Sequence, residues 1–82
     1  MQAVLKKFEE LGYEINCNIN NFIRLKSKES FKTITIYLDK KQFICHHFEE
    51  MIPLLIDFQE IQLINELFKK EAQNESIQIR GK

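Results

Sequence analysis

Two cysteines and two adjacent histidines are the side chains in this sequence that could bind a metal ion. Cys45, His46 and His47 are consecutive, and Cys17 lies in a separate strand-like segment. Cysteine and histidine are the ligands that zinc prefers in proteins. Neighbouring residues on a β-strand point to opposite faces of a sheet, however, so His46 and His47 cannot easily bind one ion. We therefore predict no metal site and no cofactor, with one histidine on the surface and the other at the margin of a sheet.

The other patterns that could support catalysis are equally weak. No glycine-rich turn or helix N-terminus lies beside Cys17 or Cys45 to lower a thiol pKa. The adjacent acids Glu49 and Glu50 are more typical of a solvated turn than of an acid–base pair, and with two glycines in 82 residues the chain lacks a phosphate-binding loop. Two cysteines are too few for a disulfide-stabilised scaffold, so we expect reduced, buried thiols, with a cross-strand disulfide as the alternative. We predict that the protein is not an enzyme, and we identify no small-molecule substrate.

The elements that position these residues follow from the periodicity of the apolar side chains. Residues 2–11 have helical periodicity and are followed by Gly12, which predicts a short first helix. Alternation of apolar and polar residues then predicts a run of strands. The expected strands are residues 13–18, 22–26, 31–38 and 42–47. Their expected inward-facing residues are Tyr13, Ile15, Cys17, Ile23, Leu25, Ile34, Ile36 and Leu38, whereas the facing of residues 42–47 cannot be assigned.

A capping box predicts where the last helix begins. Asp57 directly precedes an apolar set at helical spacing, and Glu60 follows it by three residues. The apolar set comprises Phe58, Ile61, Ile64, Leu67 and Phe68. We expect this helix to end near Gln73. Residues 48–56 are ambiguous because Pro53 fits either a first helical turn or an extended lead-in, and we favour the lead-in.

These elements predict an α+β fold of order α-β-β-β(-β)-α, an antiparallel meander with both helices packed on one face. We expect residues 1–73 to form a single domain and residues 74–82 to be a flexible C-terminal tail, in which residues 76–80 could add an edge strand. The residues expected to pack together in the core are Phe8, Ile34, Ile36, Ile61 and Phe68.

The sheet face away from the helices is the candidate binding surface. Two neighbouring strands place cations, hydroxyls and one aromatic ring on it. These residues are Arg24, Lys26, Thr33, Thr35 and Tyr37. Sheets that bind single-stranded RNA combine stacking rings with cations in a similar way. This chain has zero formal net charge, however, and we therefore favour a protein partner or a second copy over nucleic acid.

The charge is unevenly distributed along the chain. Residues 22–41 hold six basic and two acidic side chains, whereas residues 42–68 hold five acidic and no basic ones. Such a dipolar chain could orient a partner. No apolar run approaches the length of about 18 residues that a membrane span needs, and the N-terminal residues do not resemble a signal peptide. We predict a cytoplasmic protein that does not associate with membranes.

The segment 53–67, Pro-Leu-Leu-Ile-Asp-Phe-Gln-Glu-Ile-Gln-Leu-Ile-Asn-Glu-Leu, follows a strand-rich region and resembles the C-terminal helices of small uncharacterised phage and prophage proteins. The ten lysines against two arginines are similar to the usage of low-GC Gram-positive bacteria. The resemblance covers about a quarter of the chain and carries over no functional residue. It implies a small accessory protein, or an inhibitor that acts by binding a host protein such as a defence factor.

Overall fold

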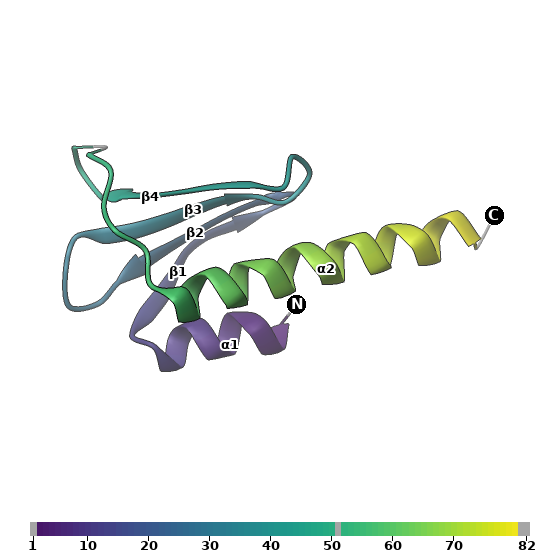
Figure 1. Ribbon diagram of the computed structural model, residues 1–82, viewed down its shortest axis with the longest axis horizontal. Coiled ribbons are helices and arrows are strands. Elements are labelled where there is room, and N and C mark those ends of the chain that lie inside the picture. Colours follow the sequence, from purple (N-terminus) through teal and green to yellow (C-terminus); the bar gives the residue numbers. More distant parts are fainter. Residues whose placement is uncertain (1, 51, 81–82) are drawn as a thin grey trace.

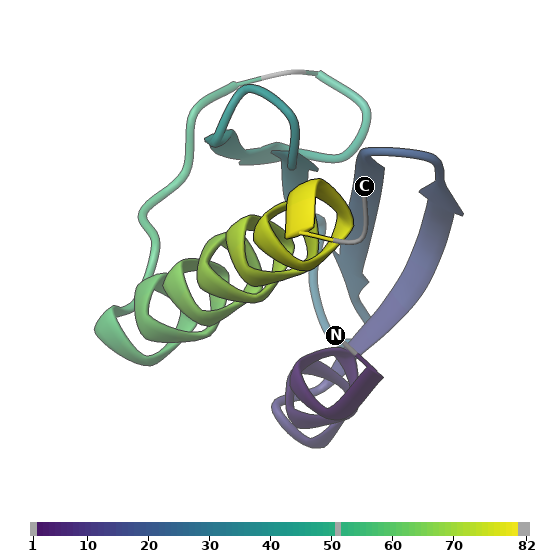
Figure 2. The ribbon, with the colours of Figure 1, turned by 90° about the vertical axis from the view of Figure 1, so that its right-hand side faces the viewer.

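The computed structural model describes the backbone of residues 2–50 and 52–80 and the side chains as far as Lys70. The elements are α1 (Gln2–Glu10), β1 (Tyr13–Ile19), β2 (Phe22–Ser27), β3 (Lys32–Tyr37), β4 (Gln42–His47) and α2 (Phe58–Arg80). The four strands form one antiparallel sheet in the order β1-β2-β3-β4. Both helices lie on the same side of this sheet (Figures 1 and 2). The predicted α+β meander is therefore confirmed.

The short turns between these elements use residues with positive φ. Gly12 follows α1 with φ of 98°, as expected for a helix-terminating glycine. Asn20 has φ of 54° in the turn between β1 and β2, a conformation that asparagine tolerates. Lys41 adopts φ of 54° before β4, and no residue type in that turn indicates it. Sequential hairpins with such tight turns fix the register of the whole sheet.

The hydrophobic core lies between the sheet and the two helices. Ile23 and Leu25 of β2 and Ile34 and Ile36 of β3 have no exposed surface, which confirms the predicted facing of the two central strands. The helices contribute the other large apolar side chains, which include Val4, Leu5, Phe8, Leu63, Ile64 and Leu67. Complete burial of each side chain of this size contributes about 1.5–3 kcal/mol. The inner face of the sheet thus depends on α2 for much of its cover.

An extended lead-in connects β4 to α2, as favoured by the sequence. Pro53 pairs with His46 of β4 in an isolated antiparallel bridge. The backbone N–H of Leu54 donates to the carbonyl of Cys45 (3.0 Å), and the N–H of His47 donates to the carbonyl of Ile52 (2.7 Å). We refer to residues 52–57 as the lead-in. It covers the outer edge of β4 along the second half of that strand.

A β-bulge changes the predicted facing of β1. The register shifts between Ile15 and Cys17, so that Ile15 pairs with Leu25 of the inner face while Cys17 pairs with Arg24 of the outer face. The prediction that Cys17 faces inward is therefore wrong. A bulge inserts one extra residue, here Asn16, and thereby reverses the alternation beyond it.

The last helix is longer than predicted. It continues to Arg80, past the expected end near Gln73, and residues 76–80 extend the helix instead of adding an edge strand. The physical reason is that residues 58–80 contain no glycine or proline, and the first helix-terminating residue type is Gly81. Residues 81–82 of the predicted tail lie outside the described residues.

Candidate functional site

A buried polar cluster fixes the N-terminal end of α2 to the sheet. Glu60 on α2 is 5% exposed and is surrounded by donors from three elements. The Tyr13 hydroxyl donates to Oε2 (2.6 Å), and the Lys32 ammonium lies 2.8 Å from Oε1. The backbone N–H of Asp57 also donates to Oε1 (2.9 Å). The Glu60 carboxylate therefore joins β1, β3 and the start of α2, and both of its oxygens are used.

The pKa values in this cluster follow from burial and from these contacts. Burial alone would raise the pKa of Glu60, but the hydrogen bonds from Lys32, Tyr13 and Asp57 outweigh it and lower the pKa below its usual value. Burial tends to lower the pKa of Lys32, yet the bond to Glu60 and its charge raise it. Burial, followed by the bond to Glu60, raises the pKa of Tyr13 well above its usual range. At neutral pH the cluster is a neutralised Glu–Lys ion pair with a protonated tyrosine, which suits a structural role.

Only half of the predicted capping box forms. Glu60 accepts the backbone N–H of Asp57, and Ile61 makes the first helical bond to the Asp57 carbonyl (3.0 Å). The Asp57 carboxylate instead lies 3.8 Å from Lys32, with its side chain 77% exposed. The helix begins where predicted, but Glu60 stabilises its first turn more than Asp57 does.

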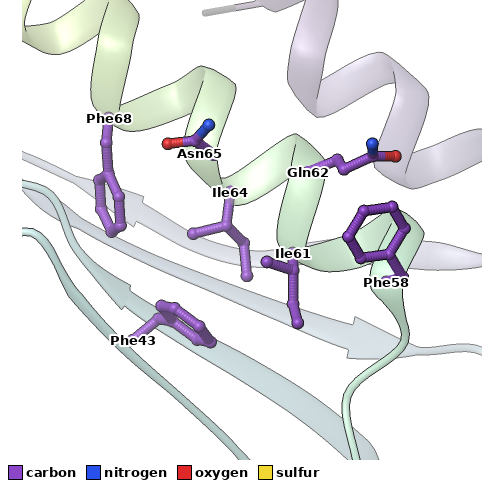
Figure 3. A pocket seen from close by; sticks show the side chains of 7 residues that line it. All are labelled: Phe43, Phe58, Ile61, Gln62, Ile64, Asn65 and Phe68. Atoms are coloured by element: carbon purple, nitrogen blue, oxygen red, sulfur yellow. The ribbon is translucent and has the colours of Figure 1, made fainter.

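A groove opens between α2 and the edge strand β4. We call it the α2–β4 groove. It is lined by Phe43 of β4 and by Phe58, Ile61, Gln62, Ile64, Asn65 and Phe68 of α2, with a volume of about 410 Å³. Figure 3 shows Ile61 and Ile64 pointing from α2 toward the ring of Phe43. Among the side chains that the structure describes, the lining contains no charged group, and its only polar side chains are two amides.

Ile61 lines the groove, so its predicted place in the core is wrong. Ile61 was expected to pack inside, but it is 38% exposed, and Phe58 is 71% exposed. The residues of α2 that the sheet covers are spaced around Glu60, Ile64 and Leu67, so Phe58 and Ile61 lie on the flank of the helix that faces β4. Their apolar character suggests core residues in the sequence, and periodicity alone could not separate the two flanks.

Further exposed apolar side chains lie in the lead-in, close to the start of the groove. Leu55 is 91% exposed, and Ile52 and Leu54 are also exposed. Scattered apolar residues are normal on a protein surface, but a contiguous apolar surface commonly marks an interaction site. The lead-in and the groove thus bring several exposed apolar side chains close together along the chain, from Ile52 to Ile61.

The predicted binding surface lies on the opposite, outer face of the sheet. The register places all five residues on this face: Arg24, Lys26, Thr33, Thr35 and Tyr37. Only Tyr37 is exposed, whereas Thr33 and Thr35 are buried and the two cations are half-buried. The two threonines were expected to be accessible, and they are not, because β3 lies between strands that carry longer side chains. Their hydroxyls are therefore removed from the candidate surface.

The Thr35 hydroxyl belongs to a chain of hydrogen bonds with His46. The His46 Nδ1 donates to the carbonyl of His47 at 2.9 Å, and its Nε2 lies 2.8 Å from the Thr35 hydroxyl oxygen. The Nε of Arg24 donates to the same hydroxyl (3.4 Å). Both ring nitrogens of His46 are thus used, and the ring is buried. His46 and His47 extend to opposite faces of β4, as the sequence predicts.

Aromatic rings and cations alternate on the outer face. Phe22 and Tyr37 pack edge to face with centroids 5.5 Å apart. The Arg24 guanidinium lies 5.4 Å from the centroid of Phe22, and the Lys40 ammonium lies 5.9 Å from that of Tyr37. These distances permit cation–π attraction. The sequence pattern indicated one aromatic ring on the outer face, but Phe22 and Tyr37 both lie there, and the ring of Phe48 lies 5.3 Å from the ammonium of Lys26 on the same face.

The two cysteines lie at opposite edges of the sheet and on opposite faces. Cys17 is on the outer face of β1, and Cys45 is on the inner face of β4. Both are free, so the cross-strand disulfide does not form. Burial raises the pKa of the Cys45 thiol, which therefore stays protonated at neutral pH. Among residues whose side chains are described, no three His, Cys, Asp or Glu residues come together as metal ligands.

The fold and the groove define a small α+β protein with a four-stranded meander and an apolar cleft beside its edge strand. No protein-family model, curated protein or solved structure matches this chain. The resemblance to phage proteins stays a prediction. In the described residues no helix is both long enough and apolar enough to cross a membrane.

Proposed function

We propose that this chain is a non-enzymatic binding protein that contacts a protein partner through the α2–β4 groove. The observation that carries the proposal is an uncharged apolar groove of about 410 Å³ with Phe58, 71% exposed, at its rim. Burying one such side chain in an interface gains about 1.5–3 kcal/mol, and aromatic residues are enriched in the centres of interfaces.

The distribution of titratable groups favours binding over catalysis. Among the described side chains, four groups have displaced pKa values: Tyr13, Lys32, Cys45 and Glu60. None of them lines the α2–β4 groove. Active sites usually place such groups within the cleft, where they can transfer protons or attack a substrate. In the setting that the phage-protein resemblance implies, the partner would be a host protein surface.

Affinity capture with three forms of the protein tests this proposal. Wild type, Phe58→Ser and Ile19→Ser are used to capture proteins from a lysate of the source cell after nuclease treatment. Ile19 is a matched control because it is 62% exposed and lies on β1, at the far edge of the sheet. We expect a protein that wild type and Ile19→Ser retain equally and that Phe58→Ser loses. Equal retention by all three forms contradicts a role for the groove.

A nucleic-acid-binding role is the second candidate, and the outer face supports it. The Phe22–Tyr37 pair supplies two rings for stacking, and Arg24 and Lys40 supply charge beside them. If the outer face binds single strands, Arg24→Gln should flatten the dependence of affinity on salt by roughly 0.7 for each phosphate that Arg24 neutralises. Lys6→Gln, on α1 and therefore on the other side of the sheet, should leave that dependence unchanged. Binding to oligonucleotides that is weak and indifferent to Arg24→Gln excludes this candidate.

A further inference from the structure

The outer edge of β4 is covered along only half of its length. Cys45 and His47 direct backbone groups outward, to Leu54 and Ile52 of the lead-in. Hydrogen-bonding direction alternates along an antiparallel strand, so the N–H and C=O of Phe43 also point outward, away from β3. In residues 2–50 and 52–80 no backbone segment pairs with this part of the edge. Gln42–Ile44 therefore presents a short, unpaired strand edge.

This free edge borders the α2–β4 groove. The Phe43 side chain enters the groove while its backbone faces outward, and Ile61 and Ile64 form the opposite wall (Figure 3). A strand added beside β4 would lie about 4.8 Å farther out and would direct every second side chain to the groove face. One segment could thus use the backbone groups of Phe43 and fill the groove at the same time.

We propose, on the basis of the function proposed above, that the groove binds an extended, uncharged peptide segment that adds as a strand to β4. Strand addition combines main-chain hydrogen bonds with pockets for alternate side chains. The segment would carry apolar residues at every second position. Charged side chains are disfavoured because the described side chains of the groove offer no partner for a buried charge.

The lead-in already binds the neighbouring half of the edge in this way. Its Ile52-Pro53-Leu54 stretch is extended, apolar and uncharged, and it makes two backbone hydrogen bonds to β4. The added peptide would occupy the same edge of β4 directly after Leu54, beside the α2–β4 groove, whose described lining is likewise apolar and uncharged. A partner peptide would therefore make the same kind of backbone contact with β4 that the lead-in of this chain already makes.

A second copy of the chain fits this edge less well than a single peptide. A twofold β4–β4 pair centred on Phe43 would place the turn 38–41 of one copy opposite Cys45 of the other. That position is taken by Leu54, whose N–H is bonded to Cys45. The lead-in of each copy would therefore collide with the turn of the other, and a narrow segment avoids this collision.

A displayed library of random dodecapeptides is the probe. We expect selection against the wild-type protein to enrich uncharged sequences with apolar residues at every second position. The affinity of an enriched peptide should be at least tenfold weaker for Phe58→Ser and unchanged for Ile19→Ser. Its binding should slow hydrogen exchange of the Phe43 amide at least tenfold, because that N–H becomes bonded. Methylating the central backbone nitrogen of the peptide should weaken binding by a similar factor.

The other outcomes separate the inference from the proposed function. Enriched peptides with helical spacing that need Phe58 but leave Phe43 exchange unchanged would overturn strand addition and retain the groove as a protein-binding site. A concentration-dependent dimer, abolished by Phe58→Ser, would replace the peptide by a second copy. If no peptide is enriched, or if the enriched peptides bind Phe58→Ser as well as wild type, both proposals are wrong.

Discussion

Replacing Glu60 should destabilise the fold far more than replacing an exposed charged side chain such as Glu66. The Glu60 carboxylate accepts hydrogen bonds from Tyr13 and from the Asp57 backbone and pairs with Lys32. Glu60→Ala leaves these donors without a partner in a buried site. Removing one member of a buried ion pair costs about 3–5 kcal/mol. Because the Lys32 side chain is 19% exposed and can recover some hydration, we expect a loss of about 3 kcal/mol.

The loss is measurable by urea denaturation. With an m-value of about 1–2 kcal/mol/M for a domain of this size, the unfolding midpoint should fall by about 1.5–3 M. Glu60→Gln keeps an acceptor for the Asp57 N–H and should lose less. Glu66→Ala is the matched control on the same helix: Glu66 lies 3.8 Å from Lys7 in an exposed pair, and such pairs contribute about 0–1 kcal/mol.

Asp57→Ala provides a second comparison. Its carboxylate makes no hydrogen bond to the helix backbone in the described residues, so the change should cost no more than about 0.5 kcal/mol, the low end for an N-cap. The reasoning is refuted if Glu60→Ala shifts the midpoint no further than Glu66→Ala. It is also refuted if Asp57→Ala is as costly as Glu60→Ala, because the N-cap would then be the main stabilising contact.

Three further predictions concern titration, packing and the backbone. The lowered pKa of Glu60 means that the unfolding free energy falls as the pH drops below 4.5, and the raised pKa of Tyr13 means that it also falls above pH 10.0. Urea midpoints measured below and above this pH range check both effects, and Glu60→Gln should weaken the loss of stability at acid pH. Ile36→Ala should cost about 2–5 kcal/mol and Ile61→Ala less than half as much, and equal midpoints for the two variants would contradict the groove. Gly12→Ala should lower the unfolding free energy by about 1–2 kcal/mol because of the φ of 98° alone, since no atom lies near the added Cβ. An unchanged thermal unfolding midpoint would refute this prediction.

Local patterns in the sequence predicted the elements and the two central strands of the sheet. The alternation over residues 22–26 and 31–38 and the start of a helix at residue 58 depend only on neighbouring residues, and the structure has both strands and this helix start where predicted, although only the Glu60 half of the capping box forms. The bulge at Asn16 could not be predicted, because an extra residue in a polar stretch leaves no mark on the alternation until the partner strand is known. The end of the last helix was predicted too early because the loss of an apolar pattern does not by itself end a helix.

The parts of the site that the sequence did not predict depend on tertiary arrangement. Thr33 and Thr35 become buried only because β3 is flanked on both sides by strands. Phe58 and Ile61 resemble core residues until the position of β4 is known. Glu60 offered one usable signal in the sequence. It precedes Ile64 by four residues and Leu67 by seven, so it lies on the same buried stripe of the helix, where a charged side chain requires a partner.

The position of α2 after all four strands has a consequence for biosynthesis. The last strand residue, His47, is synthesised before Ile64 and Leu67, which cover the inner face of the sheet. At synthesis rates of about 5–20 residues per second, the interval from His47 to Leu67 lasts roughly 1–4 s. Until Ile64 and Leu67 have left the ribosome, any part of the sheet that has already emerged exposes its apolar inner-face side chains, such as Ile23, to other chains. A chain truncated within the lead-in would therefore lack the cover that Ile64 and Leu67 provide, and after release it should be prone to aggregation.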